Sequence, residues 1–326
     1  MGFATFVYNQ LLVNPSLPAT SFKNQTAIIT GSNTGLGLEA ARHIARLGAQ
    51  KVILAVRDTE SGQAARTEIK SSINRTREIE VWPLDLASTD SVLQCASKAK
   101  ELQRIDTLVL NAAVATKVFR IADGYEHSIR VNTINQFLLA FLLLPKMRQT
   151  ADEFLERETA PHITILTSQV HAWPEFPQWK DERGILVALS DESTAKMDER
   201  YPVTKVLNVL LTREFSSRID GSGVVVNMVD PGFCHSRLSR ENMGVEALVF
   251  NLFKRIFART EEVGARTIVA AAVAGRSSHG QYMVNGVVAD EALSDWVKGD
   301  GTMVQKRLWE ELEDILNKVQ DGVMHF

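Results

Sequence analysis

Cysteine is scarce in this chain of 326 residues, which contains only Cys95 and Cys234. The two residues stand far apart, without a CxxC spacing or a cluster of histidines. The sequence therefore predicts neither a zinc site nor a disulfide framework, and no other metal is expected. This cysteine usage fits a reducing compartment, so we expect a cytoplasmic location.

A surplus of positive charge is also absent. The chain has 36 Lys and Arg against 39 Asp and Glu, a net charge of -3 and a pI near 6.2. Nucleic-acid binding normally leaves a basic footprint, so a nucleic-acid partner is not expected.

Long hydrophobic runs are missing as well. The longest, FLLAFLLLP from Phe137, is too short to span a bilayer and predicts a buried helix. The N-terminal stretch MGFATFVYNQLLVNP lacks the basic start and cleavage site of a secretory signal, and Phe6 stands where myristoylation needs Ser or Thr. We expect residues 1–21 to form a docking arm, with a peripheral membrane contact as the alternative.

Apolar runs alternate with helical patterns along most of the chain. The runs are TAIIT, KVILAV, EIEVWPLDL, IDTLVLNAA, PHITILTS, GVVVNMVDPG and a late strand near QYMVNGV. Unbroken apolar strands separated by helices predict an α/β domain over residues 22–326, with a parallel sheet covered on both faces. We expect a long helix at about Glu126–Met147 and another that begins near Tyr201. The irregular stretches at 169–200 and 233–260 are predicted to cover a site.

Residues 30–37 read TGSNTGLG and lie between a predicted strand and a predicted helix. Such a turn presents backbone N–H groups at a helix N-terminus, where the helix dipole favours an anion such as pyrophosphate. Its glycines allow the backbone to approach that group closely. The alternative is a glycine-rich connection that binds nothing.

The end of the second predicted strand indicates which dinucleotide would bind. An acidic residue there would favour NAD, but the strand ends in Val56 and Arg57 follows. A guanidinium at this position would neutralise a 2′-phosphate, which favours NADP. Asp58 could pair with Arg57 or repel that phosphate, and a solvated surface arginine is the alternative.

The stretch YPVTK at 201–205 places Tyr201 and Lys205 on one face of a helix. A nearby ammonium stabilises phenolate, so we expect the pKa of Tyr201 to fall from about 10 towards the working pH. Pro202 would be tolerated in the first turn of that helix. Ser168 ends the strand HITILTS at the edge where ligands bind, with Thr167 as its rival, and Asn132 is a polar residue within the long helix.

With these residues together, the chain resembles the short-chain dehydrogenase/reductase family over about residues 22–290. It is most similar to the retinol-dehydrogenase-like branch, which includes fungal reductases of lipophilic natural products. The motifs that carry the resemblance are TGSNTGLG, Asp85-Leu86, LNAA at 110–113, Asn132, Ser168, YPVTK and DPG at 230–232. Leu110, Ala113 and Thr204 depart from the family pattern without removing a catalytic group. The resemblance implies a Rossmann-like, doubly wound sheet of seven parallel strands with helices on both faces.

The resemblance also implies a role for each matching residue. Tyr201 would exchange a proton with the carbinol oxygen, while Lys205 would bind the nicotinamide ribose and lower the pKa of the tyrosine. Ser168 would polarise the carbonyl, and Asn132 would hold a water that links Lys205 to solvent. Asp85 would contact adenine, Asn111 would lie along the adenosine side, and Pro231-Gly232 would border the nicotinamide. The implied cofactor contacts are Gly31, Ser32, Asn33, Gly35, Leu36, Gly37, Arg57, Asp85, Leu86, Asn111, Tyr201, Lys205, Pro231, Gly232 and Ser236.

The covering segments favour a bulky lipophilic substrate, because both HAWPEFPQW and EALVFNLFKRIF at 246–257 are apolar. An oligomer contact and a membrane-touching helix are the alternatives for 246–257. By analogy with the family, a homodimer or homotetramer is expected.

We therefore expect an NADP(H)-dependent oxidoreductase of secondary metabolism. It would transfer a hydride between nicotinamide and the carbonyl or secondary alcohol of a polyketide-like or terpenoid-like substrate, chiefly in the ketone-reducing direction. One alternative uses the same site for a non-redox step, such as cyclisation or epimerisation. The other is a non-catalytic cofactor-binding scaffold, which loss of Tyr201 or Lys205 would have favoured.

Overall fold

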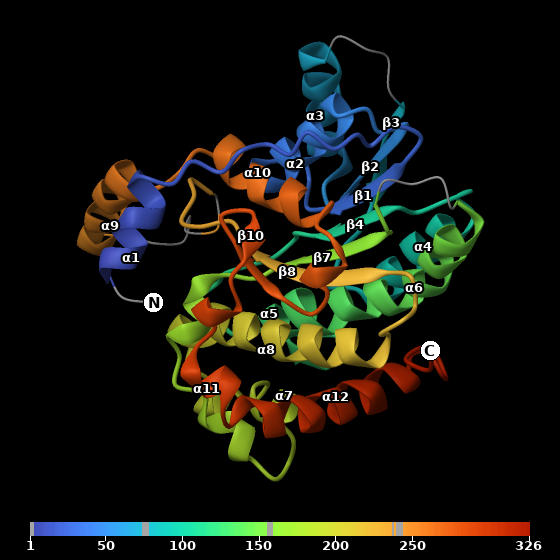
Figure 1. Ribbon diagram of the computed structural model, residues 1–326. Helices are drawn as coiled ribbons and strands as arrows, with labels where there is room; N and C mark the ends of the chain where they lie inside the picture. Colours follow the sequence, from blue (N-terminus) through green and yellow to red (C-terminus); the bar gives the residue numbers. More distant parts are fainter. Residues whose placement is uncertain (1–2, 74–77, 155–158, 237, 239–243) are drawn as a thin grey trace.

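The computed structural model describes residues 3–73, 78–154, 159–236, 238 and 244–326. An eight-stranded sheet lies at its centre, with strand order β10-β9-β8-β7-β4-β1-β2-β3 (Figure 1). Its strands are β1 (Thr26–Thr30), β2 (Lys51–Val56), β3 (Glu78–Pro83), β4 (Thr107–Leu110), β7 (His162–Leu166), β8 (Val225–Asp230), β9 (Tyr282–Val284) and β10 (Val287–Val288). Seven strands pair in parallel and β10 runs antiparallel to β9. The predicted doubly wound sheet of seven parallel strands is confirmed, and β10 extends it at one edge.

Helices cover both faces of this sheet, as Figure 1 shows. The longer helices are α1 (Phe3–Leu11), α2 (Gly35–Arg46), α3 (Thr59–Ser72), α4 (Thr89–Lys100), α6 (Asn135–Glu153), α8 (Met197–Arg218), α9 (Gly244–Phe257), α10 (Glu261–Ala271) and α12 (Gly301–Asn317). The shorter ones are α5 (His127–Ile129), α7 (Ile185–Ala188) and α11 (Asp295–Lys298). One face of the sheet packs on α2, α3 and α10, and the other on α4, α6 and α8. Outside α8 lies α12, which adds a further layer on that side.

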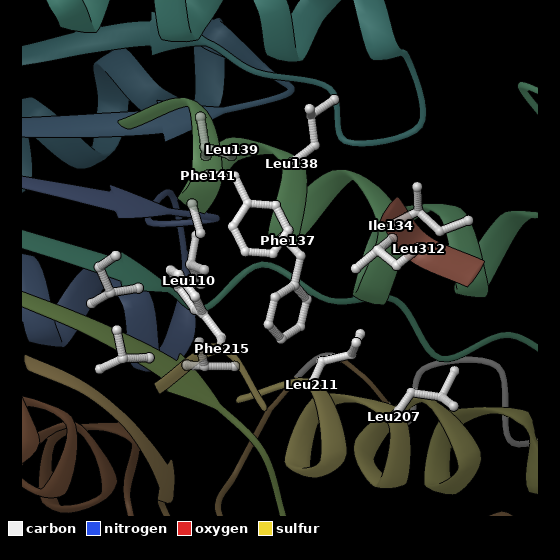
Figure 2. Close-up of a cluster of buried hydrophobic side chains, with 14 of the residues drawn as sticks. Leu110, Ile134, Phe137, Leu138, Leu139, Phe141, Leu207, Leu211, Phe215 and Leu312 are labelled. Carbon is white, nitrogen blue, oxygen red and sulfur yellow. The ribbon is translucent and has the colours of Figure 1, made fainter. Parts of the chain in front are cut away.

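The largest core cluster joins α6, α8 and α12 beneath the sheet. Figure 2 shows Phe137 and Phe141 of α6 pointing towards Phe215 of α8, with Leu312 of α12 in the same cluster. The ring centroid of Phe141 lies 4.9 Å from that of Phe215 and 5.5 Å from that of Trp309, both in edge-on geometry. The apolar run from Phe137 is therefore a buried helix, as predicted.

The strand order reverses between β1 and β4. From β1 the chain proceeds outward to β2 and β3, then returns across β1 to β4 and continues to β7, β8 and β9. Connections therefore leave the carboxyl ends of β1 and β4 towards opposite faces, which opens a crevice between them. Ligands of open α/β sheets bind at such a point.

Two predicted helix boundaries are wrong. The long helix expected at Glu126–Met147 is a series of α5, a π-helical segment at Arg130–Ile134 and α6, which runs on to Glu153. The helix expected to begin near Tyr201 begins at Met197, so Pro202 lies in its second turn instead of its first. Acidic residues in the first turn, Asp198 and Glu199, favour this earlier start because they complement the helix dipole.

The covering segments contain short helices where the sequence predicts irregular chain. Residues 169–200 include α7 and three 3-10 turns, at Gln169–Ala172, Pro177–Lys180 and Glu192–Thr194. The whole apolar stretch at 246–257 lies within α9. A two-stranded hairpin of β5 (Ile121–Ala122) and β6 (Tyr125–Glu126) precedes α5.

Replacement of Phe141 by alanine is expected to reduce the free energy of unfolding by about 3–5 kcal/mol, since it leaves a cavity where α6, α8 and α12 meet. Urea denaturation followed by circular dichroism would measure the loss. Met303→Ala is the matched control, because Met303 is 63% exposed on α12. A loss no larger than that of the control would contradict the role given to this cluster.

Candidate active site

A cavity of about 650 Å³ lies at the carboxyl ends of the central strands. Its walls come from the segments that follow β1, β4, β7 and β8, from the first turns of α8, and from α1 and α9. Of the predicted site residues, those that line it are Leu36, Asn111, Ser168, Tyr201, Lys205, Pro231, Gly232 and Ser236. Three of the four predicted catalytic residues, Ser168, Tyr201 and Lys205, therefore share one cavity at the strand reversal, and Asn132 is not among its lining residues.

Tyr201 and Lys205 lie one turn apart on α8 and both face the cavity. The Lys205 Nζ lies 5.4 Å from the centroid of the Tyr201 ring. It donates a hydrogen bond of 2.8 Å to the carbonyl oxygen of Leu166, the last residue of β7. The predicted pair therefore exists, and the end of β7 fixes its lysine.

The protonation equilibria of this pair differ from the prediction. Burial raises the pKa of Tyr201, and the nearby carboxylate of Asp230 adds to the rise. Burial also lowers the pKa of Lys205 to about 7. The expected fall in the pKa of Tyr201 is therefore wrong for this structure, because removal of both groups from water outweighs the attraction between phenolate and ammonium.

Ser168 follows β7 and begins a 3-10 turn, where its Oγ accepts a hydrogen bond of 3.4 Å from the N–H of Val170. His171 approaches the Ser168 carbonyl oxygen through Nδ1 at 2.8 Å, and its Nε2 accepts the N–H of Ser294. The side chain of Thr167 is buried, with a relative exposure of 2%. Ser168 is the more accessible of the two rivals, so it presents the better-placed hydroxyl.

Asn132 lies in the π-helical segment and is fully buried. Its Oδ1 accepts the N–H of Val114 at 2.8 Å, and its Nδ2 donates to the Val114 carbonyl at 2.8 Å and to Thr204 Oγ1 at 3.2 Å. The side-chain amide is thus bonded at both ends. It holds the segment after β4 against α8, one residue from Lys205.

The glycine-rich turn between β1 and α2 is braced from β4. Asn111 Nδ2 donates to the carbonyl oxygens of Thr30 at 2.8 Å and Gly31 at 3.1 Å. A Cβ on Gly37 would lie 2.5 Å from that same Nδ2, so only glycine fits there. At the helix N-cap, Thr34 makes no side-chain capping bond. The first-turn N–H groups are therefore not satisfied by their own cap.

Ser32 and Asn33 complete this turn, and Gly31 and Gly35 both adopt φ of 64°. The Oγ of Ser32 donates to the Ile29 carbonyl and the residue is fully buried, so its side chain serves the turn itself.

Arg57 is exposed directly after β2. Asp58 is the N-cap of α3, where its side chain accepts from the N–H groups of Glu60 and Ser61. Asp58 therefore stabilises the start of α3. Its capping contacts orient it towards the helix, which reduces the conflict that the sequence suggested with a phosphate near Arg57.

Asp85 and Leu86 follow β3. Asp85 is half-buried and its Oδ1 accepts the N–H of Ala87 at 2.9 Å, while Leu86 is buried and its carbonyl accepts from Asn135. His127 lies close by. Burial is the main cause of its lowered pKa. The charges of Asp85 and Arg57 are among the others that act on this pKa. His127 had no motif to identify it.

Of three further residues near the site, Asp230 belongs to the DPG motif, whereas Arg200 and Glu126 escape the sequence motifs. Asp230 is buried at the end of β8 and accepts the N–H of Gly232 at 2.9 Å. Arg200 and Glu126 form a buried ion pair of 3.3 Å that ties the start of α8 to the end of β6. The ion pair joins residues that lie far apart in the sequence, so no local pattern indicates it.

Comparison with known proteins is consistent with this geometry. A family model described as short chain dehydrogenase matches residues 25–153. The short-chain dehydrogenase anuD of Penicillium roqueforti is 40% identical over 330 residues, which cover 99% of this chain and 85% of that protein. The short chain dehydrogenase/reductase dmxR8 of Cryptosporiopsis sp. is 41% identical over 326 residues and 98% of each protein.

Solved structures share the fold at lower identity. The RhlG/NADP active-site complex of Pseudomonas aeruginosa is similar with a TM-score of 0.62 and 20% identity, over 82% of this chain and 97% of that chain. An NADPH-bound carbonyl reductase from chicken fatty liver gives a TM-score of 0.60 and 16% identity, over 82% and 99%.

No helix in the described ranges combines the length and apolar character that crossing a membrane requires.

The lowered pKa of Lys205 predicts a dependence of stability on pH. From pH 7 to about 10.5 the unfolded chain keeps this proton and the native state releases it, so stability rises with pH by up to about 1.4 kcal/mol per unit. Lys205→Met should lack this contribution. Urea midpoints between pH 7 and 9, without added nucleotide, would measure the difference. Lys70→Met, on an exposed part of α3, is the control. Parallel curves for the unmodified protein and Lys205→Met would contradict the assignment.

Proposed function

Because the chain belongs to the short-chain dehydrogenase/reductase family of oxidoreductases, we propose that it reduces the carbonyl of a bulky lipophilic substrate with NADPH. The reverse reaction would oxidise the corresponding secondary alcohol. The observation that carries the proposal is the convergence of Ser168, Tyr201 and Lys205 on one cavity at the strand reversal. An acid, a second hydroxyl and a buried amine at that place are the groups that carbonyl reduction needs.

The protonation states support the reducing direction. The raised pKa of Tyr201 keeps its phenol protonated at neutral pH, which suits a group that gives a proton to a developing alkoxide. Lys205, with a pKa of about 7, exchanges protons in the same pH range and can return one to the tyrosine. The Ser168 hydroxyl would donate to the same oxygen and stabilise its charge.

The chain's own residues fit a nicotinamide dinucleotide. The uncapped first turn of α2 offers backbone N–H groups and the positive end of the helix dipole to a pyrophosphate. Lys205 would bind the ribose at the nicotinamide end, and Pro231-Gly232 and Ser236 would border the ring. Bound NADP(H) supplies the hydride. Asn132 would act through its backbone in a proton relay, since its side-chain amide is already bonded at both ends.

A preference for NADP over NAD is supported by Val56 and Arg57 after β2. The Arg57 guanidinium is exposed and makes no hydrogen bond or ion pair with the described residues. Asp85, Leu86 and Asn111 would enclose the adenosine half, with Gly31, Ser32, Asn33, Gly35, Leu36 and Gly37 along the phosphates.

The nature of the cavity wall supports a lipophilic substrate. Phe233, Phe250 and Phe253 line it from the segment after β8 and from α9, and Trp173 lines it from the segment after β7. Apolar walls with a few polar groups at one end are typical of sites for drug-sized lipophilic molecules. The similarity to fungal short-chain dehydrogenases supports a role in secondary metabolism. The proposed substrate is a polyketide-like or terpenoid-like ketone.

A cytoplasmic location, a homodimer or homotetramer and a peripheral membrane contact remain predictions. An oligomer formed through α8 would have to accommodate α12, which packs along that helix within the same chain.

The reaction is tested with NADPH deuterated at C4 and a pool of lipophilic ketones and aldehydes, with mass spectrometry of the alcohols. We expect label in the products of the unmodified protein, and a loss of about 10²–10⁴-fold in Tyr201→Phe with NADPH binding retained. Tyr8→Phe, at an exposed position, is the control. NADPH binding without label transfer would favour the non-redox or scaffold alternatives.

The cofactor preference is tested by Arg57→Leu. Loss of a charge-assisted contact to the 2′-phosphate should weaken NADPH binding by about tenfold to hundredfold and leave NADH binding nearly unchanged. Fluorescence titration of each nucleotide gives both affinities, and Lys70→Leu is the control for the loss of a surface charge. Equal affinities of the unmodified protein for NADPH and NADH would contradict the assignment.

A further inference from the structure

The N-terminal helix α1 lies against α9 at the cavity, far in sequence from the motifs that define the site (Figure 1). Phe6 of α1 lines the cavity directly. Its ring stacks on Phe253 with centroids 5.9 Å apart and planes at 10°, and it lies 6.3 Å from the ring of Phe233. One side chain of the arm therefore belongs to the same aromatic wall as the residues of α9.

Hydrogen bonds of Gln10 hold α1 in this position against α9. Gln10 Nε2 donates to the carbonyl oxygens of Phe233 at 2.7 Å and Phe257 at 2.9 Å, and its Oε1 accepts the N–H of Phe233 at 3.2 Å. Gln10 is 9% exposed, so these bonds are shielded from water. A single amide thus joins α1 to the segment after Pro231-Gly232 and to the end of α9.

Arg259 adds a second attachment. Its guanidinium donates to the carbonyl oxygen of Val13 at 3.1 Å, to that of Asn9, and to Asn285 Oδ1 at 2.7 Å. The side chain is buried. The arm is therefore anchored on both sides of α1's carboxyl end, and the position of Phe6 is set by bonds to the folded domain.

The wall that results is aromatic as well as apolar. The ring of Phe233 meets that of Phe250 edge-on with centroids 5.8 Å apart, and it is tilted by 52° to that of Phe253 at 5.4 Å, so faces and edges of several rings border one space. Trp173, 68% exposed, lines the cavity from the segment after β7. Rings arranged in this way attract another flat ring system through stacked and edge-on contacts, in addition to the effect of burial.

We propose that α1 is a wall of the substrate site, that Phe6 contacts the substrate, and that the wall selects a ketone on a flat aromatic or conjugated ring system. Gln10 is a positioning residue, which acts through Phe6 and the segment at Phe233. The inference deepens the proposed function and rests on it for the identity of the reacting ketone. The attachment of α1 and its share in the cavity are independent of that function.

The test compares two probes of similar size, 2-acetonaphthone and its saturated analogue 2-acetyldecalin. Calorimetry with the full chain, with and without NADP⁺, measures their binding without turnover. We expect the unmodified protein to bind 2-acetonaphthone at least about tenfold more tightly than 2-acetyldecalin. Phe6→Ala should remove most of that difference and leave NADP⁺ affinity unchanged. Phe6→Trp should restore it.

The same helix offers matched controls. Tyr8 and Leu12 are 56% and 74% exposed on or just after α1, and Tyr8→Ala and Leu12→Ala should leave both affinities unchanged. Gln10→Leu should weaken 2-acetonaphthone binding as Phe6→Ala does, because the amide positions α1 against Phe233. Thermal denaturation of each variant establishes that the domain is folded.

Each result supports or overturns the proposal. If Phe6→Ala binds 2-acetonaphthone as tightly as Tyr8→Ala does, α1 is not a wall of the site. If the unmodified protein binds both probes equally, or binds neither, the aromatic substrate class is wrong. Reduction is measured separately with NADPH: selective binding without reduction would count against the proposed function and leave the inference standing.

Discussion

Hydrogen bonds between the ends of β1 and β4 hold the part of the structure on which the site depends. Thr30 Oγ1 accepts the N–H groups of Asn111 and Ala112, each at 3.0 Å, and Asn111 Nδ2 returns two bonds to the carbonyls of Thr30 and Gly31. These bonds span the point where the strand order reverses. They use carbonyl groups of the glycine-rich turn, and Thr34 at the N-cap of α2 makes no side-chain bond to the first-turn N–H groups. Close packing at Gly37 leaves no room for a side chain, which makes the turn and the Asn111 brace one unit.

The second constraint is the low polarity of the floor of the cavity. Burial opposes charge on Tyr201 and on Lys205 alike, and the structure resolves this with a protonated phenol and an amine whose pKa lies near 7. Asp230 is buried in the same region and burial raises its pKa too. Burial therefore disfavours the charged form of each of these three groups. A mechanism that needs proton transfer at a carbonyl oxygen is favoured by this arrangement.

Much of the fold and the centre of the site were predictable because they depend on local patterns. Short stretches of sequence contain the apolar strands, the helical spacing and the four-residue separation of Tyr201 and Lys205. The early start of α8 was missed although its first turn carries the acidic residues Asp198 and Glu199. The buried pair of Arg200 with Glu126 was missed because it joins residues 74 positions apart. The direction of the Tyr201 pKa was missed for a different reason: sequence shows which charges are near one another, and burial, which decides the outcome here, is known only once the chain is folded.

Long-range contacts also join the N-terminal helix α1 to the segment that follows β8. Gly232 has φ of 81°, and a Cβ there would lie 2.8 Å from Gln10 Oε1 and 3.0 Å from an Arg259 guanidinium nitrogen. The residue proposed to border the nicotinamide is thus also the one against which the N-terminal arm closes. A side chain at this position would push away the arm and, with it, Phe6. The proposed border of the nicotinamide and the proposed substrate wall share the segment from Pro231 to Phe233. A displacement of one is therefore expected to displace the other. The N-terminal segment, which the sequence predicts to be a docking arm, is in this sense continuous with the candidate active site.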